Sequence, residues 1–384
     1  MKDYLKIITA QESAVSFLPK NVTAQFGFAQ KIAVKLCENY NKILIFCTDQ
    51  GYFTLGKSVK DELLSSNLLV TCFCLDKDCF TPKNVQKLLA DESGADCVIV
   101  VGDDELALNF KKLLSSEFKL IFMPLSFDFG AFLQCEEVSN ISLVFDDEVF
   151  ASLSKNKLLS GVKSVLSKRI TFIESAVYEL IGGLLSEKEY LSLAVYAQEC
   201  LLNYLSSRSL QSLIRAQFFA SLAIGSLPIQ NSPLSCASQI VDYEGLAEFG
   251  EREYMFYQML LKIYSLYQNN DTDFLVKLPC PIDCFLEGNN QISNLPEFVF
   301  DGQRLAECKR AVKDSERIKQ SVNKYLAELE SLEKVFYSIY AGRKYTVQNY
   351  NQKQRTSALK QAPLACAKIS LLKLIWADGV LEYI

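Results

Sequence analysis

The sequence contains no histidine in its 384 residues. A chain without histidine has no imidazole metal ligand, no Ser-His-Asp triad and no histidine general base. Glycine (16 residues, about 4%) and proline (9 residues, about 2%) also fall below their usual ~7% and ~5%. This scarcity predicts a helix-rich protein, and any catalysis by it must use other side chains.

Long apolar runs are missing as well. No stretch reaches the ~20 uninterrupted apolar residues of a membrane span, and the N-terminus lacks the apolar core of a signal peptide. The 13 cysteines form no C-x-x-C pair, and Cys47, Cys72, Cys74 and Cys97 lie in apolar runs, as reduced cysteines packed as small hydrophobes do. We therefore expect a cytoplasmic chain with no membrane partner.

Basic residues are not in excess, because 40 Lys and Arg face 45 Asp and Glu for a formal net charge of −5. Nucleic-acid binding surfaces depend on an excess of Lys and Arg, so we expect no nucleic-acid partner. Hydrophobic residues make up 49% of the chain, which is enough to build the cores of two or three domains.

The first 150 residues alternate strand and helix patterns. Short apolar runs rich in strand formers are separated by segments with apolar residues at helical spacing. Strands that are apolar nearly throughout predict a parallel sheet with helices on both faces, and ligands of such sheets bind beyond the carboxyl ends of the strands. The predicted strands are 42–48, 68–75, 97–101, 120–123 and 141–145; the predicted helices are 21–40, 57–66, 81–91 and one that follows 101 and ends near 115.

The pattern changes between residues 150 and 156, and from there on long helical segments follow one another. We predict an α/β nucleotide-binding-like domain over residues 1–153 and an all-helical domain over residues 154–384. The last long helix carries an apolar stripe, and we interpret its charged side as a solvated face rather than a coiled-coil seam. The predicted helices are 158–182, 187–206, 210–224, 236–248, 251–267 and 313–340.

Four short motifs point to a family. Residues 100–111 resemble V-G-G-G-S-x-x-D-x-x-K, and residues 159–168 resemble S-G-x-x-D-x-L-x-K. Residues 232–243 resemble S-x-P-x-S-G-A-E-H-x-x-S-H without the residue between Ser and Pro, and residues 249–250 follow where the family has His-Gly. Their order and spacing resemble the iron-containing alcohol dehydrogenase, glycerol dehydrogenase and dehydroquinate synthase group, above all its glycerol-1-phosphate dehydrogenase branch.

The resemblance implies a Rossmann-like α/β domain with a parallel sheet, followed by an all-α domain. It also implies a chemistry in which NAD(P) binds the α/β half and a zinc or iron ion between the halves polarises an alcohol for hydride transfer. The family's metal ligands are one Asp and two His. Carried over by motif, these positions fall on Ser164, Gln239 and Phe249, so we expect no metal cofactor.

The family's cofactor loop is altered at Gly102, Asp103 and Asp104, because two carboxylates stand where glycines would approach a pyrophosphate. One interpretation is a degenerate NAD(P) site. The other, which we favour, is that both Asp residues cap a helix and complement its dipole, which disfavours NAD(P).

Three further positions belong to the candidate cofactor site. The family's polar loop after the fourth predicted strand becomes apolar here at Leu125, although Asp128 keeps an acidic residue. Asp49 follows the first predicted strand, where a ribose contact is one interpretation and an ordinary turn residue is the other.

Lys163, Lys168 and Arg169, with Arg215, form a basic group near the inter-domain cleft that the resemblance implies. An anion site there is one interpretation, and a solvated helix face is the one we favour.

Three hypotheses follow for the function. The first is a pseudoenzyme that keeps the dehydrogenase fold and binds a small ligand in the cleft. The second is an active NAD(P) oxidoreductase that acts on a polyol or glycerol phosphate without a metal. The third is an interaction or scaffold protein. The resemblance also implies self-association into a homo-oligomer.

Overall fold

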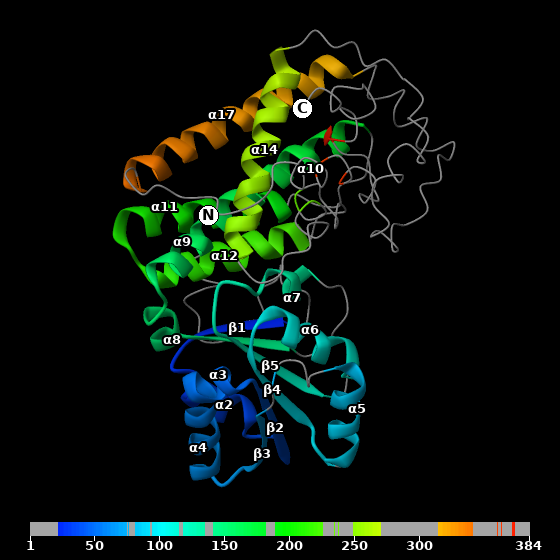
Figure 1. The fold of residues 1–384 in the computed structure, drawn as a ribbon, viewed down its shortest axis with the longest axis vertical. Helices are drawn as coiled ribbons and strands as arrows, with labels where there is room; N and C mark the ends of the chain where they lie inside the picture. Colours follow the sequence, from blue (N-terminus) through cyan, green and yellow to red (C-terminus); the bar gives the residue numbers. More distant parts are fainter. Residues whose placement is uncertain are drawn as a thin grey trace, which may run out of the picture. The chain divides into compact units, whose positions relative to one another are not determined.

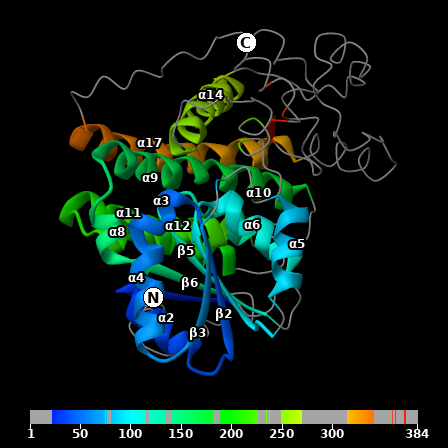
Figure 2. The same ribbon diagram turned by 60° about the horizontal axis from the view of Figure 1, so that its bottom comes forward.

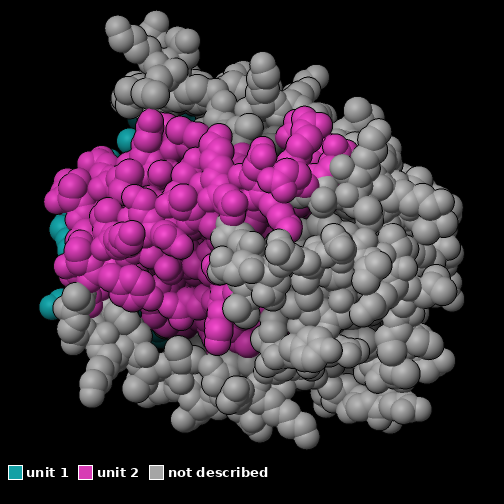
Figure 3. Space-filling model, turned by 90° about the horizontal axis from the view of Figure 1, so that it is seen from above, with its two compact units in different colours: residues 1–158, 208–225 teal, residues 159–207, 226–384 magenta. Residues whose placement is uncertain are grey.

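A computed structural model describes residues 22–74, 76, 81–92, 94–114, 118–134, 141–181, 189–225, 249–269 and 314–340, with single positions at 234, 237, 359, 362, 371 and 372. The described residues form two compact units. Unit 1 comprises residues 1–158 and 208–225, and unit 2 comprises residues 159–207 and 226–384 (Figure 3).

A six-stranded, fully parallel sheet forms the centre of unit 1 (Figure 1). Its strand order is β1-β6-β5-β4-β2-β3, and every residue of β4, β5 and β6 is buried. The predicted α/β class and parallel sheet are confirmed. The strands are β1 (Val22–Gly27), β2 (Lys42–Cys47), β3 (Leu69–Cys74), β4 (Cys97–Gly102), β5 (Lys119–Pro124) and β6 (Ile141–Asp146).

The predicted helix over 21–40 is wrong in its first part. Val22–Gly27 is strand β1, which pairs with β6 along its full length, and only Ala29–Cys37 is helical (α2). Gly27 separates the two with a φ of +143°, a conformation that glycine adopts at no steric cost. Pairing with a distant strand overrides local helical spacing here, because β1 is an edge strand with a mixed polar and apolar sequence.

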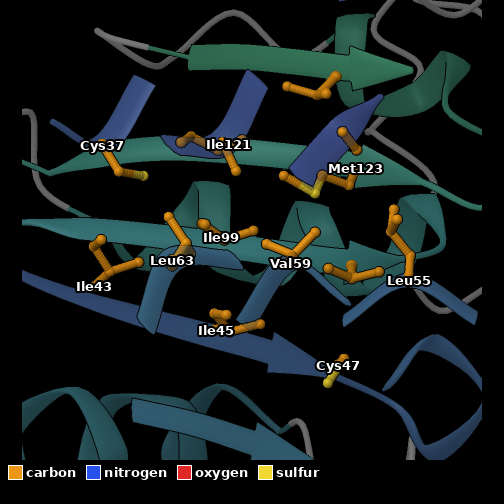
Figure 4. Packing of buried hydrophobic residues seen from close by; sticks show 14 of the residues in the cluster. Cys37, Ile43, Ile45, Cys47, Leu55, Val59, Leu63, Ile99, Ile121 and Met123 are labelled. Carbon is orange, nitrogen blue, oxygen red and sulfur yellow. The ribbon is translucent and has the colours of Figure 1, made fainter. Parts of the chain in front are cut away.

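Helices cover both faces of the sheet, as Figure 2 shows. On one face, α2 and α4 (Lys57–Ser65) pack on Ile45, Ile99 and Ile121 of the strands (Figure 4). On the other face, α6 (Asp104–Leu113) places Phe110 against Phe46, with ring centroids 4.5 Å apart. The other elements up to residue 151 are α3 (Asp49–Gly51), the π-helical turn η1 (Tyr52–Gly56), α5 (Pro82–Asp91), α7 (Gly130–Gln134) and α8 (Asp147–Ala151).

Unit 2 is helical. The predicted helix over 158–182 is two helices, α9 (Lys155–Lys168) and α10 (Ile170–Leu180), because the chain turns at Arg169. The other described helices of the unit are α11 (Glu189–Ser207), α14 (Phe249–Asn269) and α17 (Ser315–Tyr340). None of the described helices is long and apolar enough to cross a membrane. The predicted helix over 236–248 lies outside the described residues except at 237.

The two compact units divide the chain differently from the predicted domains. Helix α12 (Leu210–Gly225) belongs to unit 1, although the sequence pattern places it among the helices of residues 154–384. It packs on α7 and α8, and Phe218 lies against Phe145 of β6 with centroids 6.1 Å apart. The α/β unit therefore takes one helix from the helical half of the sequence.

Candidate functional sites in the two units

The strand order fixes where unit 1 could bind a ligand. The chain leaves β2 for β3 on one side and then returns to β4 on the other side, so the carboxyl ends of β2 and β4 meet at a topological switch point. Gly51 packs closely there, because a Cβ atom on it would lie 2.7 Å from the Val101 carbonyl oxygen. The turn after β2 therefore lies in direct contact with the end of β4.

Asp103 and Asp104 follow β4 at this switch point. Asp103 is the N-cap of α6, and its Oδ1 accepts a hydrogen bond of 3.0 Å from the Leu106 N–H. The buried Asp104 accepts a hydrogen bond of 2.7 Å from the Phe132 N–H of the short helix α7. The predicted capping role is confirmed for Asp103, while Asp104 serves a different helix from the one it begins.

The loop after β5 is apolar and packs into the interior of unit 1. Phe127 and Phe129 are buried, and their rings pack on Phe150 and Phe145 at centroid distances of 5.1 and 5.0 Å. The Gln217 side-chain amide donates a 3.1 Å hydrogen bond to the Phe127 carbonyl. The Phe127 carbonyl is therefore bonded to a side chain of α12.

The two predicted site residues in this loop make local contacts. The Leu125 N–H donates to the Gly102 carbonyl at 3.2 Å, which ties the end of β5 to the end of β4. Asp128 is half-buried, and its N–H donates to Ser126 Oγ at 3.2 Å.

Asp49 is exposed in the first turn after β2, and Thr48 rather than Asp49 caps that turn by accepting from the Gly51 N–H at 3.2 Å. The Asp49 carboxylate accepts a 3.0 Å hydrogen bond from Cys74. Burial, together with this carboxylate, raises the pKa of the Cys74 thiol to about 11. The Asp49 carboxylate, one interpretation of which is a ribose contact, therefore has a partner within the protein in Cys74.

In unit 2, Ser164, the residue at which the resemblance places the metal-ligating Asp, lies within a buried charge cluster. Lys168 Nζ donates to Ser164 Oγ at 2.5 Å and to Glu253 Oε2 at 3.0 Å, and Ser164 Oγ donates to the same Glu253 oxygen at 2.5 Å. The relative exposure of Ser164, Lys168 and Glu253 is 2%, 1% and 5%. An ammonium group therefore lies directly beside the predicted ligand position.

A second ion pair joins the same two helices. Lys163 of α9 pairs with Glu251 of α14, and its ammonium lies 5.3 Å from the centroid of the Tyr254 ring. Burial lowers the pKa of Lys163, and the Glu251 carboxylate opposes that shift. The Glu251 side chain stays 32% exposed, so water reaches this pair but scarcely reaches the Lys168–Glu253 pair.

The prediction of a solvated basic face is wrong for this helix. Lys163 and Lys168 are buried because α14 supplies a carboxylate for each. Arg169 is also buried, and it donates to the Ala194 carbonyl at 3.3 Å and pairs with Glu328 at 3.7 Å. Arg215 belongs to unit 1, where its guanidinium lies 5.3 Å from the Phe26 ring centroid.

Gly250 allows α14 to reach α9. A Cβ atom at Gly250 would lie 1.9 Å from the Ser160 carbonyl oxygen, and the Gly250 N–H donates to Ser160 Oγ at 3.1 Å. Phe249, at which the resemblance places the family's second His ligand, is the first residue of α14. Gln239, at which it places the first His ligand, lies outside the described residues.

The residues present do not fit a divalent cation. Zinc and iron sites use carboxylate, imidazole or thiolate donors, whereas here a neutral hydroxyl shares its oxygen with an ammonium. A second positive charge beside Lys168 would be repelled. Among the residues that the structure describes, no group of three His, Cys, Asp or Glu side chains could hold a metal ion.

Solved structures with similar architecture include those of dehydrogenases. A probable glycerol dehydrogenase from Sinorhizobium meliloti aligns over 94% of this chain and 98% of its own, at 13% identity and a TM-score of 0.54. The archaeal Red Sea brine pool alcohol dehydrogenase bound to NZQ aligns over 94% and 97%, at 11% identity and a TM-score of 0.56. This chain has the fold of these dehydrogenases. The predicted fold of an α/β Rossmann-like domain followed by a helical domain is confirmed.

An iron-containing alcohol dehydrogenase from Thermococcus thioreducens is also similar, at 12% identity and a TM-score of 0.52, over 94% of this chain and 98% of that one. No family model and no curated protein sequence matches the chain. At these identities the similarity establishes the fold, and the chemistry has to be argued from the chain's own residues.

Sequence reasoning missed Glu253. The signal was present, because Glu253 follows the Phe249-Gly250 motif by three residues and Lys168 follows Ser164 by four, one helical turn. What the sequence could not show is that α9 and α14 bring these groups together.

Proposed function

We propose that this chain is a member of the glycerol dehydrogenase and iron-containing alcohol dehydrogenase superfamily that has kept the fold without the metal-dependent oxidoreductase reaction. One observation carries the proposal: the Lys168 ammonium bridges Ser164 and Glu253 where the resemblance places the metal-ligating Asp. Among the described residues, no ligand set is present to hold the Lewis acid that such a hydride transfer needs on the alcohol oxygen.

The arrangement in unit 1 supports the same proposal. In this fold the first turn of the helix after a strand would meet the pyrophosphate of a dinucleotide. Here the Asp103 carboxylate already accepts the Leu106 N–H, and Asp104 lies beside it. A phosphate ~4 Å from one such carboxylate would be repelled by about 4 kcal/mol at an effective dielectric of ~20, and by less where water screens the pair.

The remaining role that we propose is binding. The chain would act in the cytoplasm, as a homo-oligomer like the family it resembles, and would present the inherited fold to a small ligand or a protein partner. The net charge of −5 argues against nucleic acid as that partner.

A calorimetric titration of NADH and NADPH into the untagged chain, with and without Zn²⁺, tests the proposal. The chain carries no tag, because a polyhistidine tag would itself bind Zn²⁺. We expect no nucleotide heat and no turnover of polyols or glycerol phosphates. The matched control is the D103N/D104N variant, in which the amide oxygens can still cap but the two charges are gone. Nucleotide binding by this variant alone would identify repulsion as the cause.

Turnover by the wild-type chain would contradict the proposal. Nucleotide binding and turnover without Zn²⁺ would establish the alternative, an NAD(P) oxidoreductase that works without a metal. Turnover that requires Zn²⁺ would show that the chain holds a metal that its described residues do not predict.

A further inference from the structure

We propose that the Lys168 ammonium is the resident cation of the helical unit, which occupies the place of a divalent metal ion between α9 and α14. This inference rests on the proposed function, because the place is defined by the family's metal-Asp position at Ser164. It adds that the site still requires a positive charge and that the chain supplies it covalently.

The geometry of the helices carries the first step. Gly250 lets the start of α14 come against the Ser160 carbonyl of α9, and one helical turn later on each helix Ser164 and Glu253 share a hydrogen bond. The contact therefore directs two oxygen donors toward a single point from two helices. Lys168 Nζ lies at this point, 2.5 Å from one oxygen and 3.0 Å from the other.

The electrostatics carry the second step. Glu253 is 5% exposed, and a carboxylate removed from water to this extent needs a positive partner. Lys168 is 1% exposed and donates to both oxygen atoms, so it neutralises the carboxylate where a metal ion would otherwise do so.

The neighbouring ion pair provides an internal comparison. Lys163 also joins α9 to α14, but its partner Glu251 is 32% exposed and can be hydrated when the lysine is removed. Removal of Lys163 should therefore be tolerated far better than removal of Lys168. The two lysines lie on one helix, and their partners lie on one helix, so most other variables are matched.

The test exchanges one cation for another. The S164D/K168A variant removes the ammonium and places a second carboxylate opposite Glu253. We expect it to have a lower Tm than the wild type and to recover it on titration with Zn²⁺ or Mn²⁺, with reversal by EDTA. We expect no change in wild-type Tm with either ion or with EDTA, and S164D/K163A, which keeps the ammonium, should not respond.

Two results would overturn the inference. One is a wild-type Tm that rises with Zn²⁺ and falls with EDTA, with both changes abolished by E253Q. The other is a folded S164D/K168A variant whose Tm does not change with Zn²⁺ or Mn²⁺. If that variant does not fold, the single variants decide. K168M should lower Tm by about 5 °C and K163M by less than half of that, and E253Q should restore most of the loss in K168M. Equal losses for K168M and K163M would also overturn it.

A failure of the cation role of Lys168 can be distinguished from a failure of the proposed function. Nucleotide turnover by the wild type without added metal would contradict the proposed function and leave the cation exchange intact. A failed exchange in a wild type that binds no nucleotide would contradict only the role of Lys168.

Discussion

Gly250→Ala tests the contact that assembles the buried charge cluster. The added Cβ would lie 1.9 Å from the Ser160 carbonyl oxygen, whereas Cβ atoms essentially never come within 3.0 Å of another atom, so the helices would have to separate by more than 1 Å. The obstacle is backbone, which cannot rotate away as a side chain can. Overpacking in a core costs about 1–3 kcal/mol and sometimes more, and here the shift would also stretch the buried Lys168–Glu253 pair. We expect a loss of at least about 3 kcal/mol.

The matched control is Gly56→Ala, in which the new Cβ would lie 3.3 Å from the Cys47 sulfur, a side-chain atom. Alanine is also the better helix former by about 0.5–1 kcal/mol, so this variant should stay within about 1 kcal/mol of the wild type. Urea denaturation followed by circular dichroism measures both. A Gly250→Ala protein within about 0.5 kcal/mol of the wild type would refute the close approach of α14 to α9.

Three further predictions concern single side chains. Glu174 is fully buried, accepts hydrogen bonds from Tyr264 and the Leu371 N–H, and burial raises its pKa to about 8. The protonated carboxyl contributes its full stability below pH ~4.5, and this contribution, at most about 5 kcal/mol, is lost as pH rises to about 8. E174Q should therefore unfold at a higher urea concentration than the wild type at pH 9 and show a flatter dependence of stability on pH. Equal pH profiles would contradict this. D103A should lose about 1 kcal/mol with the α6 cap, while D103N should lose less, as measured by urea denaturation; equal losses would contradict the capping role. Cys74 should react slowly with iodoacetamide at pH 8, and D49N should accelerate it, because the carboxylate raises the thiol pKa; an unchanged rate at Cys74 by peptide mass spectrometry would contradict the contact.

The sequence predicted most of unit 1 because its strands are continuously apolar and short. Strands β2, β4, β5 and β6 were found from their short apolar runs, since a strand buried on both faces leaves little choice of residue. The edge strand β3 was found from its apolar run as well, although its residues are half-buried or exposed. The edge strand β1 was missed, because its sequence mixes polar and apolar residues and its pairing partner β6 lies more than a hundred residues away. Local periodicity carries no information on such a partner.

The charge cluster was only half predictable. The motif comparison predicted that Ser164 stands where the family has its metal-ligating Asp, but it left Lys163 and Lys168 on a solvated face. Their burial follows from α14, whose first turn approaches α9 only because residue 250 is a glycine. The Asp103 cap was predictable because both the cap and the helix are local. Asp104 was not, since its partner Phe132 is 28 residues away.

The most direct test of the central claim is a crystal structure of the untagged chain grown with Zn²⁺, with an anomalous difference map at the zinc edge. A site-specific map is needed because the 13 cysteines could bind zinc elsewhere. We predict continuous density for the Lys168 side chain up to Ser164 and Glu253 and no anomalous peak between them. A peak at ~2.0–2.2 Å from the Glu253 carboxylate, with Lys168 displaced, would contradict the account.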